Sequence, residues 1–510
     1  MSTKKDEVAH VETGHAVSLA DIEAPPAMAP GMKKLYFFFF FCFWASTMNG
    51  YDGTLMGSVY AMKQFTDHWR IERESTGMST MMVLYKVGGW LAAFIAGPVS
   101  DKWGRRFGMA SGSFVVAIGT VLMAVADNNN SAGYGLMLVG RFLAGFGVNI
   151  ACASAPSYVV EISPPQYRGT IGGAYNTFWF VGFILASWVS YGTNRLSGDI
   201  SWRVPLWTQL VPSVFICIGV FLMPESPRWL IANGRNEEAR AILAKYHAEG
   251  NTDAPLVDFQ YQEMVSSITT DGSDKRFWDY SGLFKNHNSR YRFLMVFIVA
   301  FCGQMSGSAI FSYFSATIMD AAGIGSQDTQ LLINGVKAVI QFLCAILIGA
   351  RLTDKVGRRK MLITGTGLFC IWLSCVAIGV AQVENGVGPL AIFGIFAFDI
   401  TNAISWTPMQ ALYAVECLDN QTRVKGMGIS GLITYLALAV NDYAVPLGIK
   451  AISWRFFVIY IIWDFLETVF FYFFLVETKG LTLEELDEVF DAPNPRNASL
   501  EKVAALQNRA

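Results

Sequence analysis

Charged side chains are scarce in this sequence of 510 residues, and long hydrophobic runs take their place. Only 15% of the residues are Asp, Glu, Lys or Arg, whereas 53% are hydrophobic. A soluble domain carries about a quarter charged residues, so this composition excludes a soluble globular protein. The formal net charge of -2 leaves no basic excess. Nothing therefore indicates nucleic acid as a partner.

Cysteine frameworks and catalytic signatures are also missing. The eight cysteines lie in or beside apolar runs, and none has the spacing of a metal site or a disulfide framework. No phosphate-binding loop, metal cluster or nucleophile triad is found, so we expect no enzyme activity, no cofactor and no metal. The first 33 residues lack the apolar core of a cleavable signal peptide. The first hydrophobic span should therefore direct membrane insertion itself.

Apolar runs long enough to cross a bilayer dominate what is present. A spanning helix needs about 20 mostly apolar residues. Twelve runs qualify: 35–60, 79–100, 107–126, 134–160, 169–191, 204–223, 291–316, 328–352, 361–381, 389–414, 426–447 and 453–476. The sequence therefore predicts an all-α membrane protein with twelve transmembrane helices.

Basic residues concentrate in alternate loops, which predicts the orientation. The loops after the second and eighth spans, and the long segment 224–290, are rich in Lys and Arg, whereas the intervening loops carry few. By the positive-inside rule, both termini and segment 224–290 should be cytoplasmic. Within this segment, residues 236–246 and 256–268 have the periodicity of short amphipathic helices. On the other side of the membrane, Asn129 begins an Asn-x-Ser acceptor sequence for glycosylation.

The chain repeats itself at intervals of 252 to 255 residues. The sequence Asp-Lys-x-Gly-Arg-Arg occupies residues 101–106 and recurs 253 residues later. Glu161 recurs as Glu416, and Glu225 recurs as Glu477. Two homologous six-helix halves are therefore expected to pivot around a site at the membrane midplane. The predicted units are an N-terminal tail 1–34, bundles 35–223 and 291–476, a helical linker 224–290 and a C-terminal tail 477–510.

The repeated loop resembles the signature of the major facilitator superfamily. Residues 224–230, Pro-Glu-Ser-Pro-Arg-Trp-Leu, resemble the sugar-porter motif that follows the sixth span. Residues 476–485, Val-Glu-Thr-Lys-Gly-Leu-Thr-Leu-Glu-Glu, resemble the motif after the twelfth, and residues 161–169 resemble a third. The resemblance implies two pseudo-symmetric six-helix bundles and a sugar substrate. Segments 244–251, 289–292 and 406–408 also resemble a fungal branch that contains lactose, cellodextrin and hexose permeases.

Charged residues of both signs gather at the cytoplasmic helix ends. Opposite charges there can pair between the two halves. Single exposed pairs are weak, but a network could latch the cytoplasmic gate when the protein faces outward. The predicted gate residues are Asp101, Arg105, Arg106, Glu161, Arg168, Glu225, Arg228, Asp354, Arg358, Arg359, Glu416, Arg423 and Glu477. The alternative is ordinary positive-inside charge with incidental partners.

Asp52 lies within the first span, where a carboxylate is costly unless it is paired and so marks a functional candidate. At 1.5 Å per residue, Asp52 is about 27 Å along the first span, and Arg141 is about 12 Å from the outer end of the fourth. The two can therefore share the outer half of the membrane, and protonation of Asp52 would open such a pair. The alternative is a structural buried ion pair.

The family resemblance gives these two residues a role. Proton-coupled sugar symporters carry an Asp and an Arg at the matching positions, whereas mammalian facilitative glucose transporters have Asn at the Asp position. The resemblance therefore implies proton symport with Asp52 and Arg141 as coupling residues.

Substrate-binding residues are also implied by the resemblance. Asn176 stands where glucose transporters have Gln, and Gln304 matches the second Gln of the family pattern Gln-Gln-x-Ser-Gly-x-Asn. Gly303 and Ala309 replace the first Gln and the Asn of that pattern, so two sugar-contacting amides are missing.

Trp406 and Asn441 are the further candidates for a sugar site. Amides pair with hydroxyl groups, and aromatic faces stack on the apolar face of a sugar ring. For each amide, a hydrogen bond between helices is the alternative.

Two lysines inside the membrane need partners, because lone intramembrane lysines are expensive. Asp399 and Asp442 are candidate partners for Lys337 in the eighth span. Lys86 in the second span has no evident partner, and snorkelling to the outer interface is the alternative.

The sequence therefore predicts a plasma-membrane importer of a hexose or disaccharide that works by proton symport and alternating access, and functions as a monomer. The expected partners are the sugar, protons and bilayer lipid. A facilitative uniporter, an exporter of a small metabolite and a non-transporting sensor are the alternatives. The tail of about 34 residues disfavours a sensor, which would be expected to carry a long signalling tail.

Overall fold

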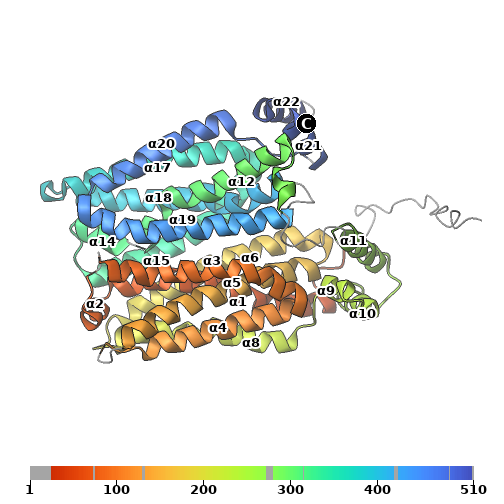
Figure 1. Cartoon of the computed structure of the whole chain (residues 1–510), viewed down its shortest axis with the longest axis horizontal. Helices are drawn as coiled ribbons and strands as arrows, with labels where there is room; N and C mark the ends of the chain where they lie inside the picture. Colours follow the sequence, from red (N-terminus) through yellow and green to blue (C-terminus); the bar gives the residue numbers. More distant parts are fainter. Residues whose placement is uncertain are drawn as a thin grey trace, which may run out of the picture.

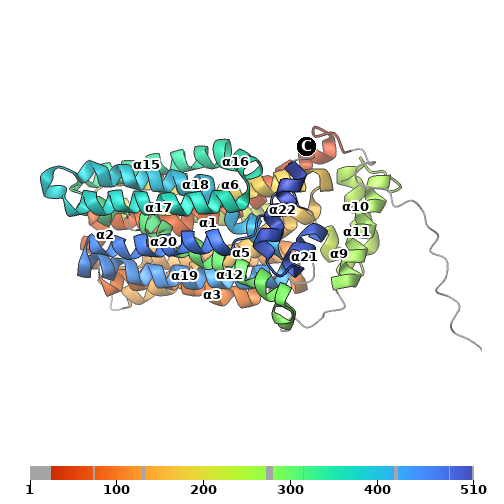
Figure 2. The same ribbon diagram turned by 90° about the horizontal axis from the view of Figure 1, so that it is seen from above.

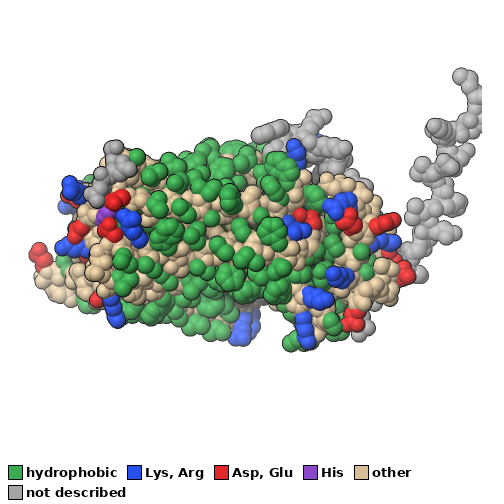
Figure 3. Space-filling view, turned by 90° about the horizontal axis from the view of Figure 1, so that it is seen from below, with side chains coloured by type: hydrophobic (Ala, Val, Ile, Leu, Met, Phe, Trp, Pro, Cys, Tyr) green, Lys and Arg blue, Asp and Glu red, His purple; other side chains and the backbone are tan. Residues whose placement is uncertain are grey.

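The computed structural model describes residues 24–72, 75–128, 132–271, 280–313, 315–418, 423–481 and 483–507. Nearly all of the described chain is helical, and the long helices run side by side (Figure 1). Figure 3 shows hydrophobic side chains around the middle of the molecule and charged side chains gathered at its two ends. Nine helices in the described part are long and apolar enough to cross a membrane. This distribution is that of a multi-pass membrane protein.

Six spans form the N-terminal half, in the lower part of Figure 1. They are α1 (Pro30–Ala61), α3 (Thr76–Trp103), α4 (Arg105–Val125), α5 (Gly133–Ile162), α6 (Arg168–Thr193) and the consecutive pair α7 (Ile200–Thr208) and α8 (Leu210–Leu222). The short helix α2 (Lys63–Trp69) follows α1. Each predicted span of this half is confirmed within a few residues.

Six further spans form the C-terminal half, in the upper part of Figure 1. They are α12 (His287–Met305) with α13 (Ser308–Tyr313) and α14 (Ser315–Ala321), α15 (Gln327–Cys344) with α16 (Ala350–Val356), α17 (Arg358–Ala381), α18 (Gly388–Cys417), α19 (Arg423–Ile452) and α20 (Arg455–Phe474). The predicted fold of twelve spanning segments in two six-helix bundles is confirmed.

The seventh span is broken, whereas the sequence predicted one continuous run. The helix α12 ends at Met305, and a new helix starts at Ser308. Gly307 between them has a φ of 92°, a left-handed conformation that glycine adopts without strain. The break separates the longer helix α12 from the two short helices α13 and α14.

Short helices gather at one end of the molecule, which we call the linker end; the opposite end is the far end. They are α9 (Pro227–Ala232), α10 (Asn236–His247) and α11 (Pro255–Asp271) on the N-terminal half, and α21 (Leu483–Asp491) and α22 (Pro495–Gln507) on the C-terminal half (Figure 2). The two helices predicted in segment 224–290 are confirmed as α10 and α11.

His247 of α10 connects the linker helices α10 and α11 to the N-terminal half through hydrogen bonds. Its Nε2 lies 2.9 Å from the carbonyl oxygen of Ile162 at the end of α5, and its Nδ1 lies 2.7 Å from the Gln260 side chain of α11. Burial lowers the pKa of His247 below its usual value, so the neutral ring is the form that fits here.

Glycines bring the spanning backbones of the first half into contact. A Cβ atom at Gly145 of α5 would lie 1.9 Å from the backbone oxygen of Tyr85 in α3. A Cβ atom at Gly50 of α1 would lie 1.9 Å from the backbone oxygen of Trp179 in α6. Small residues let helix backbones approach closely in lipid, where the hydrophobic effect contributes little to helix association. These contacts fix where α1, with Asp52, crosses its neighbours.

Candidate functional site

At the linker end of the N-terminal half, a carboxylate fills a glycine turn. Gly104, with a φ of 96°, joins α3 to α4, and a Cβ atom there would lie 2.4 Å from a carboxylate oxygen of Glu225. The backbone N–H groups of Arg105 and Ser226 donate to that carboxylate over 3.1 and 2.9 Å. Burial raises the pKa of Glu225, and the N–H donors of the turn oppose the shift. An anion at the start of α4 is favoured by the helix dipole.

Arg105 completes this turn. Its guanidinium contacts Glu161 through two N–H···O hydrogen bonds of 3.0 Å, and its Nη1 lies 3.1 Å from Asp101. Glu161 also accepts a hydrogen bond from the hydroxyl of Ser226. Arg106 donates to the carbonyl of Val220 over 2.8 Å. The charges of this end are therefore paired among α3, α4, α5 and the segment after α8.

The C-terminal half repeats the same construction. Gly357, with a φ of 100°, would place a Cβ atom 2.6 Å from a carboxylate oxygen of Glu477. The backbone N–H groups of Arg358 and Arg359 donate to Glu477 over 3.0 and 3.2 Å. The Arg358 guanidinium contacts Glu416 at 2.8 Å. The sequence repeat is thus a repeat of geometry.

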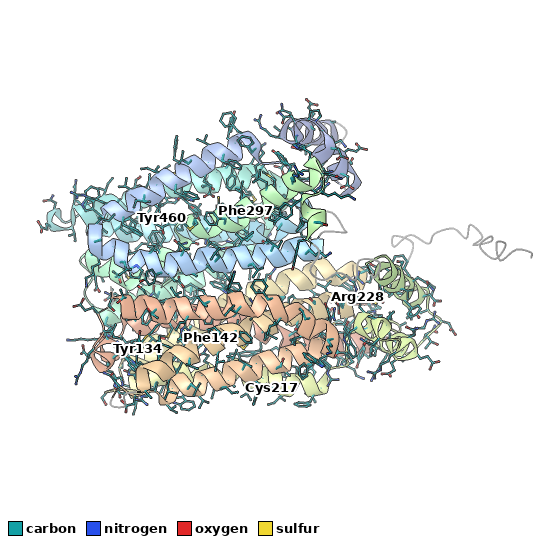
Figure 4. All side chains as sticks on the ribbon, in the orientation of Figure 1. Tyr134, Phe142, Cys217, Arg228, Phe297 and Tyr460 are labelled. Atoms are coloured by element: carbon teal, nitrogen blue, oxygen red, sulfur yellow. The ribbon has the colours of Figure 1, made fainter. Side chains whose placement is uncertain are left out.

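The predicted pairing between the halves is not seen in this conformation and stays a prediction for the outward-facing one. The ion pairs of Arg105 and Arg358 close within one half each, because the glycine turns aim these side chains at their own neighbouring helices. Arg168 pairs with Glu263 of the linker at 3.0 Å. Arg228 belongs to α9 at the linker end (Figure 4). The side chains of Asp354 and Arg423, like residue Asn129, lie outside the described part.

Three polar contacts join the halves at the far end. Lys450 of α19 lies 2.8 Å from Glu72, which follows α2. Gln327 donates to Gln64 over 3.0 Å. The amide of Asn194, just after α6, donates to Asp328 of α15 over 2.7 Å. These three contacts between the halves therefore lie at the end opposite the linker.

Asp52 and Arg141 are both buried in the N-terminal half but do not form an ion pair here. Asp52 is 0% exposed, and neither of its carboxylate oxygens accepts a hydrogen bond from a described residue. Arg141 is 2% exposed, donates to the carbonyl of Met81 over 3.3 Å, and lies 4.6 Å above the ring of Tyr85. Asp52 acts electrostatically on Arg141 and lies beside Gln209, at the joint between α7 and α8.

A buried carboxylate of the C-terminal half, Asp442, also lies within electrostatic reach of Arg141. Asp442 of α19 is 1% exposed, and neither oxygen accepts a hydrogen bond from a described residue. It interacts electrostatically with Lys86 of α3 and with Arg141, and α19 packs against α3. Lys86, whose partner the sequence did not reveal, therefore faces Asp442 across the boundary between the halves.

Lys337 is paired with Asp399, one of its two predicted candidates. The ammonium lies 2.8 Å from the carboxylate, with the two side chains 1% and 4% exposed. It also donates to the carbonyl of Phe311 in α13 over 2.9 Å and lies 3.4 Å from the hydroxyl of Ser315. Lys337 thus ties α15 and α18 to the short helices beyond the break in the seventh span.

The predicted substrate residues divide into two groups. Trp406 is 0% exposed and donates to Thr366 over 3.3 Å, so it packs inside the C-terminal half instead of lining an open surface. Asn441 donates to the backbone carbonyl of Gln304 over 2.9 Å and accepts from Tyr460 over 2.6 Å. The Asn441 amide therefore joins α12, α19 and α20, as in the helix–helix alternative (Tyr460 is marked in Figure 4).

Gln304 and Asn176 retain free amides. Neither side chain forms a hydrogen bond with a described residue. Asn176 is exposed on α6, and Gln304 is 8% exposed in α12. The amides of Gln304 and Asn176 remain available to a ligand. The amide of Asn441 and the indole N–H of Trp406 are hydrogen-bonded to other groups of the protein.

Sequence reasoning missed two carboxylates in the last span. Asp464 is 0% and Glu467 is 4% exposed, and none of their four oxygens accepts a hydrogen bond from a described residue. They stand three residues apart on one face of α20, close to Cys302 of α12 and Cys370 of α17. The signal was present, since any carboxylate within a spanning helix marks a candidate.

Comparisons with known proteins agree with this architecture. The family model described as "Sugar (and other) transporter" matches residues 38–490. The MFS-type transporter qa-x of Neurospora crassa is 29% identical over 482 residues, covering 91% of this chain and 89% of that protein. The quinate permease of Neurospora africana is 29% identical over 480 residues, covering 89% and 88%.

Solved structures give the same fold. The partially occluded inward-open conformation of the xylose transporter XylE from E. coli has a TM-score of 0.74 and 20% identity, covering 88% of this chain and 100% of that one. The proton:xylose symporter XylE bound to 6-bromo-6-deoxy-D-glucose has a TM-score of 0.72 and 20% identity, covering 90% and 100%. At this level of identity, the likeness concerns the fold alone.

Proposed function

The chain belongs to the sugar transporter family, and from that premise we propose that it imports a sugar or a related ring polyol by proton symport. The two six-helix halves alternate access to a site between them. Family membership makes the chain a multi-pass membrane transporter of a small molecule. The coupling ion, the direction and the substrate are the proposed parts.

The observation that carries the proposal is the state of Asp52. A carboxylate buried without a hydrogen bond or an ion pair is far cheaper to keep neutral than ionised. Arg141 nevertheless lies within electrostatic reach of Asp52, so an ionised Asp52 has a cation available. Binding and release of one proton can therefore change the contacts between α1 and α5, which is what a proton-coupled transporter requires.

The arrangement of contacts supports a conformation open toward the linker end. The far end holds Glu72 and Lys450 together across the two halves, whereas Arg105 and Arg358 at the linker end bind within their own halves. We place the linker end in the cytoplasm, because its loops carry the excess of basic residues. The protein then faces inward at a plasma membrane, with both termini cytoplasmic and one chain as the working unit.

The gate residues have a revised role in this proposal. Each glycine turn, with its carboxylate and arginine, makes the linker end of one half rigid. A rigid end lets the half move as a unit when the halves rotate, so the twin networks stabilise the moving bodies. Neutralisation of Glu161 or Glu416 should therefore alter the transport rate through the shape of a half.

A ring carboxylic acid is the second candidate substrate. Several relatives are named quinate permease, and quinate combines ring hydroxyls with a carboxylate. Nη1 of Arg141 is buried without a hydrogen-bond partner in the described part, so it could bind an anionic group. Sugar and quinate thus share the hydroxyl chemistry and differ in the demand for a cation.

The test is uptake into proteoliposomes that contain the purified protein. Radiolabelled D-glucose, D-xylose and quinate are offered separately, with and without an inward proton gradient. Accumulation above the external concentration, abolished by a protonophore, is expected for at least one compound. Equilibration unaffected by the gradient would indicate a facilitator. No uptake of any of the three, in either direction, would overturn the proposal.

A further inference from the structure

Gly303, near the end of α12, leaves a space that two side chains of α18 occupy. A Cβ atom at Gly303 would lie 2.9 Å from Cζ3 of Trp406 and 3.2 Å from Nε2 of Gln410. Trp406 and Gln410 stand four residues apart, on the same face of the helix. This face of α18 therefore packs against α12 where α12 has no side chain.

The two side chains differ in how their polar atoms are used. Trp406 is fully buried, and its indole N–H is bonded to Thr366. Gln410 is partly exposed, and its amide forms no hydrogen bond with a described residue. Gln304, next to Gly303, also has an amide without a hydrogen-bond partner in this part of the chain. Two free amides thus flank one glycine on facing helices.

Free amides at such a place need water or a ligand. An amide removed from water without a hydrogen bond is destabilising, and a spanning helix offers few partners. The Nε2 atom of Gln410 lies against the buried Gly303, so the side chain points toward α12 and not into lipid. Each amide offers two N–H donors and a carbonyl acceptor, which together match adjacent hydroxyl groups on a ring.

We propose that Gln410 is a substrate-contacting residue that, with Gln304, binds hydroxyl groups of the transported ring beside Gly303. This inference rests on the proposed function and names one of its specificity determinants. A hydroxyl can both donate to and accept from an amide, whereas a carboxylate can use only the N–H donors, so this position favours hydroxyls. A larger residue at 303 would displace the Gln410 amide, so the glycine keeps the position open.

The first experiment compares Gln410→Leu with wild type in radiolabelled uptake of D-glucose, D-xylose and quinate. Leucine nearly keeps the volume but cannot form the hydrogen bond. The KM for the transported compound should rise about tenfold, the effect of a lost buried hydrogen bond. Deoxy analogues of that compound refine the assay: one analogue should lose about tenfold in the wild type and nothing in Gln410→Leu. Thr407→Val, an exposed position on the same helix, is the matched control and should behave as wild type.

The second experiment is independent of which compound is carried. Gln410→Cys is made in a chain whose eight native cysteines are replaced, and a water-soluble thiol reagent is applied to inside-out membranes. Labelling of Cys at 410, slowed by the transported compound, is expected. Absence of labelling, or an unchanged KM in Gln410→Leu, would overturn the role of Gln410 even if transport is normal. Failure of wild type to carry any of the three compounds would instead overturn the proposed function.

Discussion

The two halves of the molecule share their linker-end turns but hold their intramembrane charges differently. In the C-terminal half, Lys337 and Asp399 form an ion pair of 2.8 Å that is almost completely buried. In the N-terminal half, Asp52 accepts no hydrogen bond from a described residue, and Arg141 lies over a tyrosine ring. Breaking a buried ion pair is energetically costly. Charged groups that are close but not bonded can form or lose an ion pair at a smaller cost in free energy.

This difference supports the proposal that the two halves have separate tasks. Lys337 also binds the backbone of Phe311 beyond the break in the seventh span, so its task is to hold helices together. Asp52 and Arg141, with Asp442 facing Arg141 from the other half, can respond to a proton and to the position of the halves. The same scaffold thus contains one locked and one releasable set of charges.

The largest expected effect comes from breaking the locked pair. Lys337→Met leaves Asp399 buried without its cation, which should destabilise the protein by about 3–5 kcal/mol. Lys86→Met removes the cation that faces Asp442 from the N-terminal half and should cost less, about 1 kcal/mol, because neither oxygen of Asp442 accepts a hydrogen bond from a described residue. Denaturant unfolding of the purified variants in detergent measures both. Equal losses in the two variants would contradict the distinction between the sets.

A smaller loss of stability is expected from substitutions at the two glycine turns. Glu477→Gln and Glu225→Gln each remove an anion from a helix N-terminus, which should cost about 1–2 kcal/mol. The cost should be larger at Glu477, since this side chain is 4% exposed and accepts four backbone N–H groups, whereas Glu225 is half-buried. Unfolding in detergent gives the order, with the exposed Glu501→Gln as control. The reverse order would show that burial and the number of N–H donors do not set the cost.

The smallest expected effect is a pH dependence in the docking of the linker helix α10, which belongs to the N-terminal half alone. The folded pKa of His247 is lowered by burial, so the unfolded state binds the proton first as the pH falls. The docking of α10 should therefore weaken below about pH 6.5 and be unaffected above it. Amide hydrogen exchange of residues 236–247 at pH 5.5 and 7.5 measures this. His247→Gln should remove the difference, and a pH dependence that persists in this variant would assign it to another group.

Much of the fold could be predicted from the sequence, because membrane spans are set by hydropathy and length. The repeated Asp-x-x-Gly-Arg-Arg loops located both glycine turns, and the family resemblance they carried is confirmed. The break at Gly307 was missed, since a left-handed glycine leaves no mark in a hydrophobic run.

The site was harder to predict, because partners depend on helix rotation and on conformational state. Trp406 and Asn441 have the right chemistry for a sugar, but their helices turn them inward, to Thr366 and Tyr460. The charges at the linker end were correctly located, but whether they pair within or between halves depends on which end is closed. Asp464 and Glu467 could have been found by a stricter search for carboxylates in apolar runs.

The most direct test of the account is proton-driven accumulation by Asp52→Asn in proteoliposomes. Two pH units and 100 mV supply about 5 kcal/mol, enough for several thousand-fold accumulation by a coupled transporter. Asparagine mimics the protonated carboxyl, so the account predicts that the variant only equilibrates its substrate, independently of pH, while exchange of labelled for unlabelled substrate persists. Accumulation by Asp52→Asn to the wild-type level would contradict the claim that the releasable charges of the N-terminal half couple transport to protons.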